Sequence, residues 1–238
     1  MILFYVRHGD PIYNPDSLTP LGHEQAKAVA KRFALYGLDA IYASDSNRAV
    51  LTAEPTSQLL KKKITLCPWA NEGMAWKRFA IERKDGSWGW CFHDRDMMDK
   101  LNHPEVRALG AKWYAHPFFE AYNFGEGVKQ TDEAVDAFLE SLGFSHDREN
   151  GYYQKKEPAF ERVALFAHQG MGIAFLSSLL DIPYPQICTH FDLGHSSVTA
   201  IYFDEKAERI YPKVLQSSND SHLYREGILT GYHNSIRF

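Results

Sequence analysis

The chain has 238 residues, enough to bury one generous hydrophobic core, and we predict a single domain over residues 1–238. Its formal net charge of −4 argues against nucleic acid as a general partner, so an anion site must be built locally from a few basic side chains. The sequence has no basic N-terminal segment followed by an apolar stretch, and no apolar run long enough to cross a bilayer. We therefore expect a cytoplasmic protein with no membrane partner.

The cysteines agree with this location. Cys67, Cys91 and Cys188 are widely separated and odd in number, which favours reduced thiols in a cytosolic setting. No Cys-x-x-Cys pair suggests a structural zinc ion. His190 and His195 invite a metal-site interpretation, but scattered histidines are more often structural or exposed, and we assign them no role.

The N-terminal residues have the pattern of a buried strand that ends in reactive side chains. Residues 2–6 are all apolar, with β-branched and aromatic members, and Arg7, His8 and Gly9 follow at once. Open α/β sheets bind their ligands beside the carboxyl ends of the strands, so Arg7 and His8 are candidates for a site. A guanidinium matches phosphate oxygens, and an imidazole can act as base, acid or nucleophile.

Two strand–helix units begin the chain. Thr19 followed by a proline predicts a helix start, and Gly37 predicts its end. Residues 39–44 are predicted to form a second buried strand. The side-chain oxygens of the Ser-Asp-Ser stretch at 44–46 are expected to cap a second helix, with Arg48 in its first turn. Repeated strand–helix units predict an α/β fold with a mostly parallel sheet.

An inserted segment interrupts this rhythm. The second helix is expected to kink or end at Pro55, and residues 64–66 are predicted to form a third strand before a loop with one carboxylate, Glu72. Residues 74–161 then lose the strand–helix pattern, are rich in aromatic side chains, and have their clearest helix at 131–142. These aromatics are expected to form either a satellite core packed on the sheet or a stacking platform. In both cases the insertion would cover a site at the strand ends.

The strand–helix pattern resumes near the C-terminal third. Residues 163–167 are an uninterrupted apolar run that again ends in an imidazole, His168, and an apolar helix follows. Residues 197–203 and 209–215 are predicted to form a β-hairpin at a sheet edge. We assign no structure to the tail after Ser217.

The strand ends carry matching chemistry. If the strands that precede Arg7, His8, Arg48 and His168 are neighbours, two guanidinium groups and two imidazoles meet in one pocket. Two arginines can grip the nonbridging oxygens of a phosphoryl group, and an imidazole can attack the phosphorus atom in line. The departing alkoxide needs an acid, and Glu72 is the nearest candidate if its pKa is raised by burial.

These residues resemble the histidine phosphatase superfamily, also called the phosphoglycerate mutase-like family. The resemblance covers residues 1–73 and 162–203, with the motifs in the family's order. The motifs are Arg7-His8-Gly9, Asn14, Leu18-Thr19-Pro20-Leu21-Gly22 with Gln25-Ala26, Ser44-Asp45-Ser46-Asn47-Arg48-Ala49 with Thr52-Ala53, and His168 after an apolar strand.

The resemblance implies a three-layer α/β/α sandwich and a reaction without a metal or an organic cofactor. It implies that His8 is the nucleophile that becomes phosphorylated and that Glu72 is the proton donor. The phosphate pocket would be formed by Arg7, Arg48 and His168. Asn14 would lie at the rim of the pocket.

The sequence departs from the family pattern at two positions. Gln169 follows His168 where members commonly have glycine, so its side chain would narrow the pocket or contact substrate. Asp10 replaces the more usual Glu or Gln. If the donor is not Glu72, the other candidate acids are Asp94, Asp96 and Glu126.

The sequence therefore predicts a phosphatase that hydrolyses a phosphomonoester of a small metabolite and releases phosphate. A mutase that returns the phosphoryl group to a bound sugar-acid phosphate uses the same residues, and a non-catalytic protein that binds a phosphorylated ligand is the third alternative. Self-association is left open. Some basic residues of the insertion could bind a second anionic group or form a solvated rim: Lys77, Arg78, Arg83 and Lys84.

Overall fold

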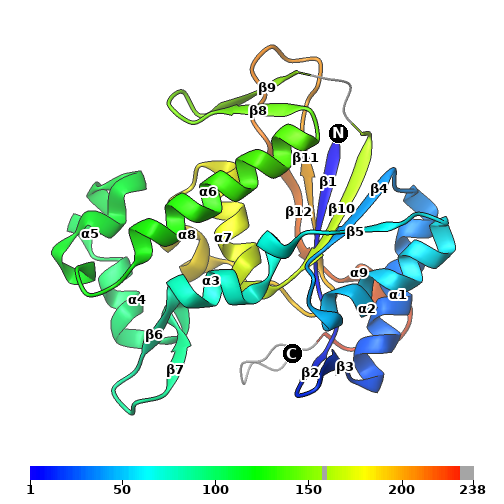
Figure 1. Ribbon diagram of the computed structural model, residues 1–238, viewed down its shortest axis with the longest axis horizontal. Helices are drawn as coiled ribbons and strands as arrows, with labels where there is room; N and C mark the ends of the chain where they lie inside the picture. The colour runs from blue at the N-terminus through cyan, green and yellow to red at the C-terminus, as the bar shows by residue number, and fades with distance from the viewer. Residues whose placement is uncertain (157–159, 231–238) are drawn as a thin grey trace.

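A six-stranded sheet forms the centre of the computed structural model, which describes residues 1–156 and 160–230 (Figure 1). Its strands are β1 (Ile2–Arg7), β4 (Ala40–Ala43), β5 (Ile64–Leu66), β10 (Arg162–Ala167), β11 (Val198–Tyr202) and β12 (Lys213–Asn219). Their order is β12-β11-β1-β10-β4-β5. The pairs β1–β10, β10–β4 and β4–β5 are parallel, and β11 runs antiparallel to both of its neighbours. The prediction of a mostly parallel α/β sheet is confirmed.

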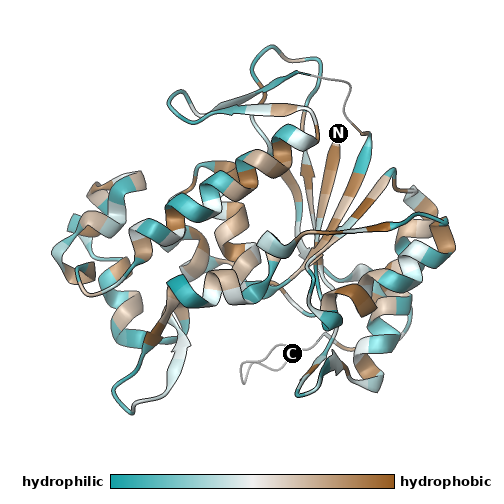
Figure 2. Cartoon of the chain, in the orientation of Figure 1, coloured by the Kyte–Doolittle hydropathy of each residue, from teal (hydrophilic) through white to brown (hydrophobic). Residues whose placement is uncertain are grey.

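Both faces of the sheet are covered by helices, which gives three layers. Phe4 and Val6 of β1 pack on the face covered by α1 (Pro20–Tyr36) and α2 (Asn47–Leu60). Leu3 and Tyr5 point to the opposite face, covered by α7 (Gln169–Leu180), as the period-2 alternation of a strand requires. Figure 2 shows that the central strands of the sheet are largely hydrophobic, as expected for strands that are covered on both faces.

The helices begin largely where the sequence predicts. The Thr19 hydroxyl accepts a hydrogen bond from the Gly22 N–H at 3.0 Å, and α1 is followed by Gly37 at φ 72°. The second helix was predicted to end or kink at Pro55. It does not end there, since α2 continues to Leu60. A proline removes one backbone hydrogen bond, and α2 is held by its packing on the sheet through the fully buried Ala53.

Between β5 and β10 lies the segment that we call the cap, residues 72–156. It contains α3 (Glu72–Phe79), the hairpin of β6 (Ala80–Glu82) and β7 (Trp88–Trp90), α4 (Arg95–Leu101), α5 (Pro104–Ala108), α6 (Phe124–Ser141) and the hairpin of β8 (Phe144–Asp147) and β9 (Tyr152–Lys155). Short 3-10 turns lie at Pro68–Ala70, before the cap, and within it at Cys91–His93, Gly110–Ala115 and Pro117–Phe119.

The long cap helix starts earlier than predicted. The sequence indicates a helix at 131–142, whereas α6 begins at Phe124. Two glycines in its first turns weaken the helical signal in the sequence. One of them, Gly127, is required by packing, because a Cβ there would lie 2.7 Å from the Arg78 Cβ. Most cap aromatics, such as Trp113, are buried in a core continuous with the α7 face of the sheet, which is the satellite-core alternative.

The C-terminal part completes the fold. The predicted edge hairpin exists as β11 and β12, with register shifts between them, and its second strand begins later than predicted, at Lys213. Further elements are β2 (Pro11–Tyr13), β3 (Asp16–Leu18), α8 (Tyr184–His190) and α9 (Ser221–Arg225). Cys67, Cys91 and Cys188 are buried free thiols. Among the described residues, every helix is too short or too polar to cross a bilayer.

Tyr5 fixes the end of β10 to its neighbour β1. Its buried hydroxyl donates a hydrogen bond to the His168 carbonyl at 2.8 Å and accepts one from the His168 N–H at 3.2 Å. Because His168 leaves β10 at this point, one side chain of β1 sets the backbone position of the second imidazole.

We predict that Tyr5→Phe lowers the free energy of unfolding by about 1–3 kcal/mol, because it leaves the buried His168 N–H without a partner. Urea denaturation followed by circular dichroism measures this. Tyr42→Phe is the control, because the Tyr42 hydroxyl makes no side-chain hydrogen bond with the described residues, and we expect a change below about 0.5 kcal/mol. Equal effects of the two substitutions would contradict the role given to Tyr5.

Candidate active site

The parallel pairing of three strands brings the predicted site residues together. β1 and β10 are in register, with Arg7 opposite Ala167, so His8 and His168 leave adjacent strands at the same edge. Their rings are 5.2 Å apart between centroids. β4 lies on the other side of β10, and the helix that follows it, α2, carries Arg48. The neighbouring strands that the convergence requires are therefore present.

His8 is buried, with 3% of its surface exposed, and its orientation defines its tautomer. Nδ1 lies 2.7 Å from the Gly9 carbonyl, which can only accept, so Nδ1 carries the proton and Nε2 keeps its lone pair. Burial, then the neighbouring His168 and Arg7, hold the pKa of His8 well below its ordinary value. The ring is therefore neutral at pH 7 and can act as a nucleophile through Nε2.

Arg7 is buried as completely as His8, and both of its Nη atoms contact the loop before β11. Nη1 donates to the Leu193 carbonyl, and Nη2 lies 2.9 Å from Nε2 of His195. Burial lowers the pKa of Arg7, and the nearby Asp192 opposes that shift. Nε has no hydrogen-bond partner among the described residues.

Arg48 is held by an acidic side chain from the hairpin of β2 and β3. Its Nη1 donates to Asp16 Oδ1 at 2.8 Å, while Asp16 Oδ2 accepts the Asn47 N–H at 2.8 Å. The guanidinium also lies over the Tyr13 ring, 5.4 Å from its centroid. As in Arg7, the Nε atom is buried and has no partner among the described residues.

His168 is held by two serine hydroxyls. Nε2 lies 2.8 Å from Ser44 Oγ and 3.2 Å from Ser46 Oγ. The expectation that these hydroxyls cap α2 is wrong for Ser46, which occupies the cap position without a side-chain cap bond and contacts the imidazole instead. Burial, followed by Arg48 and Arg7, keeps the pKa of His168 well below its ordinary value. The neutral ring leaves Nδ1 facing the pocket.

Glu72 lies at the start of α3 and reaches the start of α7. Its Oε1 accepts the Gly170 N–H at 2.9 Å, and its Oε2 is 3.7 Å from His168 Nδ1. Burial raises the pKa of Glu72 to about 7, against the opposing effect of the Gly170 N–H and the two arginines. The raised pKa favours the acid form of this carboxyl at a pH where an exposed glutamate is fully ionised.

Trp90 of the cap covers this carboxyl. A Cβ placed on Gly170 would lie 2.3 Å from the Trp90 ring and 2.7 Å from Glu72 Oε1, so only glycine leaves room for this contact. The ring is 9% exposed and is stacked on Phe92 at 5.4 Å, with Trp76 edge-on at 4.9 Å. Trp90 therefore supplies part of the burial that raises the Glu72 pKa.

Four buried polar atoms around His8 share one property. They have no hydrogen-bond partner within the described part of the chain: Arg7 Nε, Arg48 Nε, His168 Nδ1 and Glu72 Oε2. Buried polar groups are normally paired, so unpaired ones gathered in one place indicate a ligand site. Two of these atoms belong to cations and one to a neutral ring that can donate. The arrangement suits a tetrahedral anion beside an acid.

Two other predicted site residues lie differently. The Gln169 side chain is 8% exposed and donates to Asp192 Oδ1, so its amide is directed to the loop before β11. Asn14 lies exposed in the turn between β2 and β3. Its place at the pocket rim, like the roles of the other site residues, stays a prediction.

His195 belongs to this site although the sequence pattern did not indicate it. It was given no role, yet it contacts Arg7 and its ring centroid lies 5.8 Å from that of His8. The available signal was its place directly before β11, which pairs with β1 on the side away from β10. This position becomes informative only when the pairing of β11 with β1 is known, and the sequence alone does not reveal that pairing.

The alternative acids are occupied elsewhere. Asp94 accepts the Met97 N–H at the start of α4, Asp96 pairs with Lys84, and Glu126 accepts from Gln130. These contacts lie within the cap, and none of them involves a pocket residue. Glu72 is therefore the acid that the geometry favours.

One group of side chains in the described residues resembles a metal ligand set. The ligand atoms of His103, Glu105 and His116 lie within 4.8 Å of one another around α5, at the outer end of the cap (Figure 1). However, His116 Nδ1 accepts the Phe118 N–H at 3.2 Å, which puts the ring proton on Nε2, facing Glu105 at 3.3 Å. Nε2 of His116 carries a proton and therefore has no lone pair for a metal ion. We interpret the group as a set of hydrogen bonds that holds the turn after α5.

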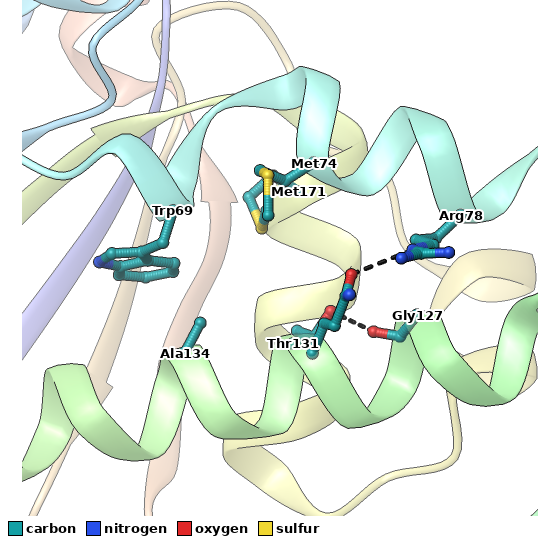
Figure 3. A pocket seen from close by; sticks show the side chains of 8 residues that line it. Trp69, Met74, Arg78, Gly127, Thr131, Ala134 and Met171 are labelled. Atoms are coloured by element: carbon teal, nitrogen blue, oxygen red, sulfur yellow. Dashed lines mark hydrogen bonds between the residues drawn. The ribbon is translucent and has the colours of Figure 1, made fainter.

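A small hollow lies between α3 and α6, beside the site (Figure 3). Its volume is about 20 Å³, which admits a water molecule but no substrate. Arg78 reaches its edge and donates to Gln130 at 3.0 Å, so this cation is engaged with α6. It is not one of the basic side chains that face His8.

Known proteins show the same signature and the same fold. Residues 3–84 match the model of the Histidine phosphatase superfamily (branch 1). The putative phosphoserine phosphatase 2 of Hydrogenobacter thermophilus is 24% identical over 219 residues, which cover 88% of this chain and 93% of that protein.

Solved structures of similar fold cover nearly the whole chain. A phosphoserine phosphatase variant from Entamoeba histolytica in complex with phosphoserine superimposes with a TM-score of 0.59 at 19% identity, over 93% of this chain and 98% of that one. A mycobacterial glucosyl-3-phosphoglycerate phosphatase in complex with VO3 gives 0.56 at 20% identity, over 90% and 97%. The matching signature in the first third of the chain, together with this fold over nearly its whole length, makes the chain similar to the histidine phosphatase superfamily.

Proposed function

We propose that this protein is a phosphatase that hydrolyses a phosphomonoester of a small metabolite through a phosphohistidine on His8. The observation that carries the proposal is the set of four buried, unpartnered polar atoms around His8, which match the oxygens of a phosphoryl group and the proton that its leaving group requires. The names of the relatives support the same reaction class, since they are phosphatases of phosphoserine and of glucosyl-3-phosphoglycerate.

In the first step the lone pair of His8 Nε2 attacks phosphorus, and the bond between phosphorus and the ester oxygen breaks. Arg7 and Arg48 neutralise the nonbridging oxygens, and His168 donates from Nδ1. Glu72 gives its proton to the departing alkoxide, so an alcohol leaves and the carboxylate remains. The products of this step are the alcohol and the phosphohistidine.

In the second step water attacks the phosphohistidine. The Glu72 carboxylate takes a proton from that water as the new bond forms, and the phosphorus–nitrogen bond breaks. Inorganic phosphate, neutral His8 and protonated Glu72 result, so the cycle closes. In this proposal the positive charge comes from the two arginines, and the reaction needs no metal ion.

The cap favours hydrolysis of a small ester. Trp90 and its aromatic neighbours cover the donor side of the pocket, which suits a metabolite better than a flat peptide surface. A mutase with the same residues would return the phosphoryl group to a bound sugar-acid phosphate. Phosphate release by the wild type distinguishes these two outcomes.

We predict that His8→Ala abolishes phosphate release from p-nitrophenyl phosphate, phosphoserine and phosphoglycerates, assayed with EDTA and without added metal. The reason is that the substitution removes Nε2 of His8, the lone pair that attacks phosphorus in this proposal. His190→Ala, which removes an exposed histidine outside the pocket, is the control and retains activity. A thermal melt confirms that both variants fold. Undiminished turnover by His8→Ala would exclude the phosphohistidine.

Glu72→Gln is expected to slow the hydrolysis of esters with poor leaving groups, such as phosphoserine, far more than the hydrolysis of p-nitrophenyl phosphate. The reason is that nitrophenolate leaves without a proton. The pH profile gives a second test. Only the acid form of Glu72 donates a proton, so for poor leaving groups the wild-type rate falls as pH rises through about 7. We call this fall the alkaline limb of the pH profile, and the variant lacks it. Equal slowing of both esters would move the donor to another residue.

Trp90→Ala is expected to shift the alkaline limb of the pH profile to lower pH. Water that reaches Glu72 stabilises its charged form, so the pKa falls from its raised value. The matched control is Trp88→Ala, which removes a 59% exposed ring from the same strand and leaves the limb in place. An unchanged alkaline limb in Trp90→Ala would show that groups other than Trp90 exclude water from the Glu72 carboxyl.

A further inference from the structure

We propose that His195 and Asp10 are positioning residues that hold the Arg7 guanidinium in the orientation that binds the phosphoryl group. This inference rests on the proposed function and adds to it a relay of side chains outside the pocket. The relay runs from Thr19 through Asp10 and His195 to Arg7.

The contacts of the relay form a continuous chain. Thr19 Oγ donates to Asp10 Oδ2 at 2.7 Å, and Asp10 Oδ1 lies 3.3 Å from His195 Nδ1. His195 Nε2 lies 2.9 Å from Arg7 Nη2. His195 is 3% exposed, so its contact with Arg7 is formed away from bulk water, whereas the Asp10 side chain is 31% exposed.

Hydrogen-bonding capacity assigns one tautomer to His195. A guanidinium has donors only, so Nε2 must accept from Arg7 and cannot carry a proton. The proton of the neutral ring then lies on Nδ1 and faces the Asp10 carboxylate, which accepts it. Asp10 therefore selects the tautomer that Arg7 needs, in the way that a carboxylate fixes a catalytic or metal-binding imidazole.

Asp10 is itself held in place. Its backbone N–H donates to Gln25 Oε1 at 2.7 Å, and the Thr19 hydroxyl that binds its carboxylate also receives the Gly22 N–H at the start of α1. A Cβ on Gly22 would lie 2.2 Å from the Asp10 carbonyl oxygen. The start of α1 and the loop after β1 are therefore packed against each other.

The loop that carries His195 is joined to the same strand end. The Ser196 N–H donates to the His8 carbonyl at 3.0 Å, and the Arg7 N–H donates to the Ser197 carbonyl at 3.2 Å. Arg7 Nη1 donates to the Leu193 carbonyl of this loop. Two nitrogens of the guanidinium are thus occupied by one rigid segment.

With both Nη atoms engaged, Arg7 Nε is buried and has no hydrogen-bond partner among the described residues, so in this proposal it is the atom left to bind the anion. A guanidinium on a flexible stem loses conformational entropy when it binds an anion, and prior fixation removes that cost. Loss of the acceptor at His195 should therefore weaken binding of the phosphoryl group, with a smaller effect on the fold.

The test measures binding of orthovanadate and inorganic phosphate by calorimetry in variants of His195. A glutamine amide reaches the place of Nε2, so His195→Gln keeps an acceptor for Arg7. An asparagine amide reaches only the place of Nδ1, so His195→Asn keeps the Asp10 contact and loses Arg7. We expect Asn and Ala variants to bind roughly tenfold to a hundredfold more weakly, as loss of a charged hydrogen bond implies, and the Gln variant to recover much of this.

His146→Gln is the matched control. The His146 side chain is also buried and contacts two aspartates, Asp136 at 3.0 Å and Asp181 at 2.8 Å, but it lies in the β8–β9 hairpin, away from the pocket (Figure 1). Its substitution should leave vanadate affinity unchanged. A merely structural effect of a buried histidine would lower affinity in both variants.

A second readout does not depend on ligand binding. Nitrogen-15 NMR of labelled histidine should show His195 with its proton on Nδ1, and Asp10→Ala should weaken this preference, because only the Arg7 contact then opposes a proton on Nε2. Wild-type vanadate affinity in His195→Asn, or a proton on Nε2 of the wild-type ring, would overturn the proposal. If the wild type binds neither vanadate nor phosphate, the proposed function fails, while the tautomer still decides whether His195 accepts from Arg7.

Discussion

The in-register parallel pairing of β1 with β10 is the constraint on which the site depends. It places His8 and His168 at one sheet edge with ring centroids 5.2 Å apart. The Tyr5 hydroxyl, bonded to both backbone groups of His168, fixes the distance between the two strand ends. A shift of one residue in this pairing would turn the imidazoles away from each other, because side chains alternate between faces.

Burial of charge gives the pocket its chemistry. Arg7 and Arg48 are held by partners outside the pocket, a carbonyl and an imidazole for the first and Asp16 for the second. Their positive charge and the low solvent access keep both imidazoles neutral, and the same burial raises the Glu72 pKa to about 7. Burial disfavours the charged form of each of these groups, so the imidazoles stay neutral and the Glu72 carboxyl keeps its proton to a higher pH.

The cap contributes more than a cover. Trp90 and Glu72 both lie against Gly170, so the β6–β7 hairpin meets the start of α7 beside the Glu72 carboxyl. Close packing by Gly127 lets α6 approach α3, the helix that begins with Glu72. The cap is thus packed closely, at Gly127 and Gly170, against the elements that hold the Glu72 carboxyl.

Local sequence patterns were enough to predict the strands at residues 2–6, 39–44, 64–66 and 163–167 and the reactive side chains that follow them, because apolar runs and turn residues are short-range signals. They failed where packing decides: α2 continues past Pro55, and the glycine-rich start of α6 is helical. Ser46 contacts His168 where a cap was expected, and His195 reaches Arg7 from the antiparallel strand β11. The sequence by itself determined which residues could do the chemistry. Only the tertiary structure decided which residues orient them, because such contacts join side chains that are far apart in the chain.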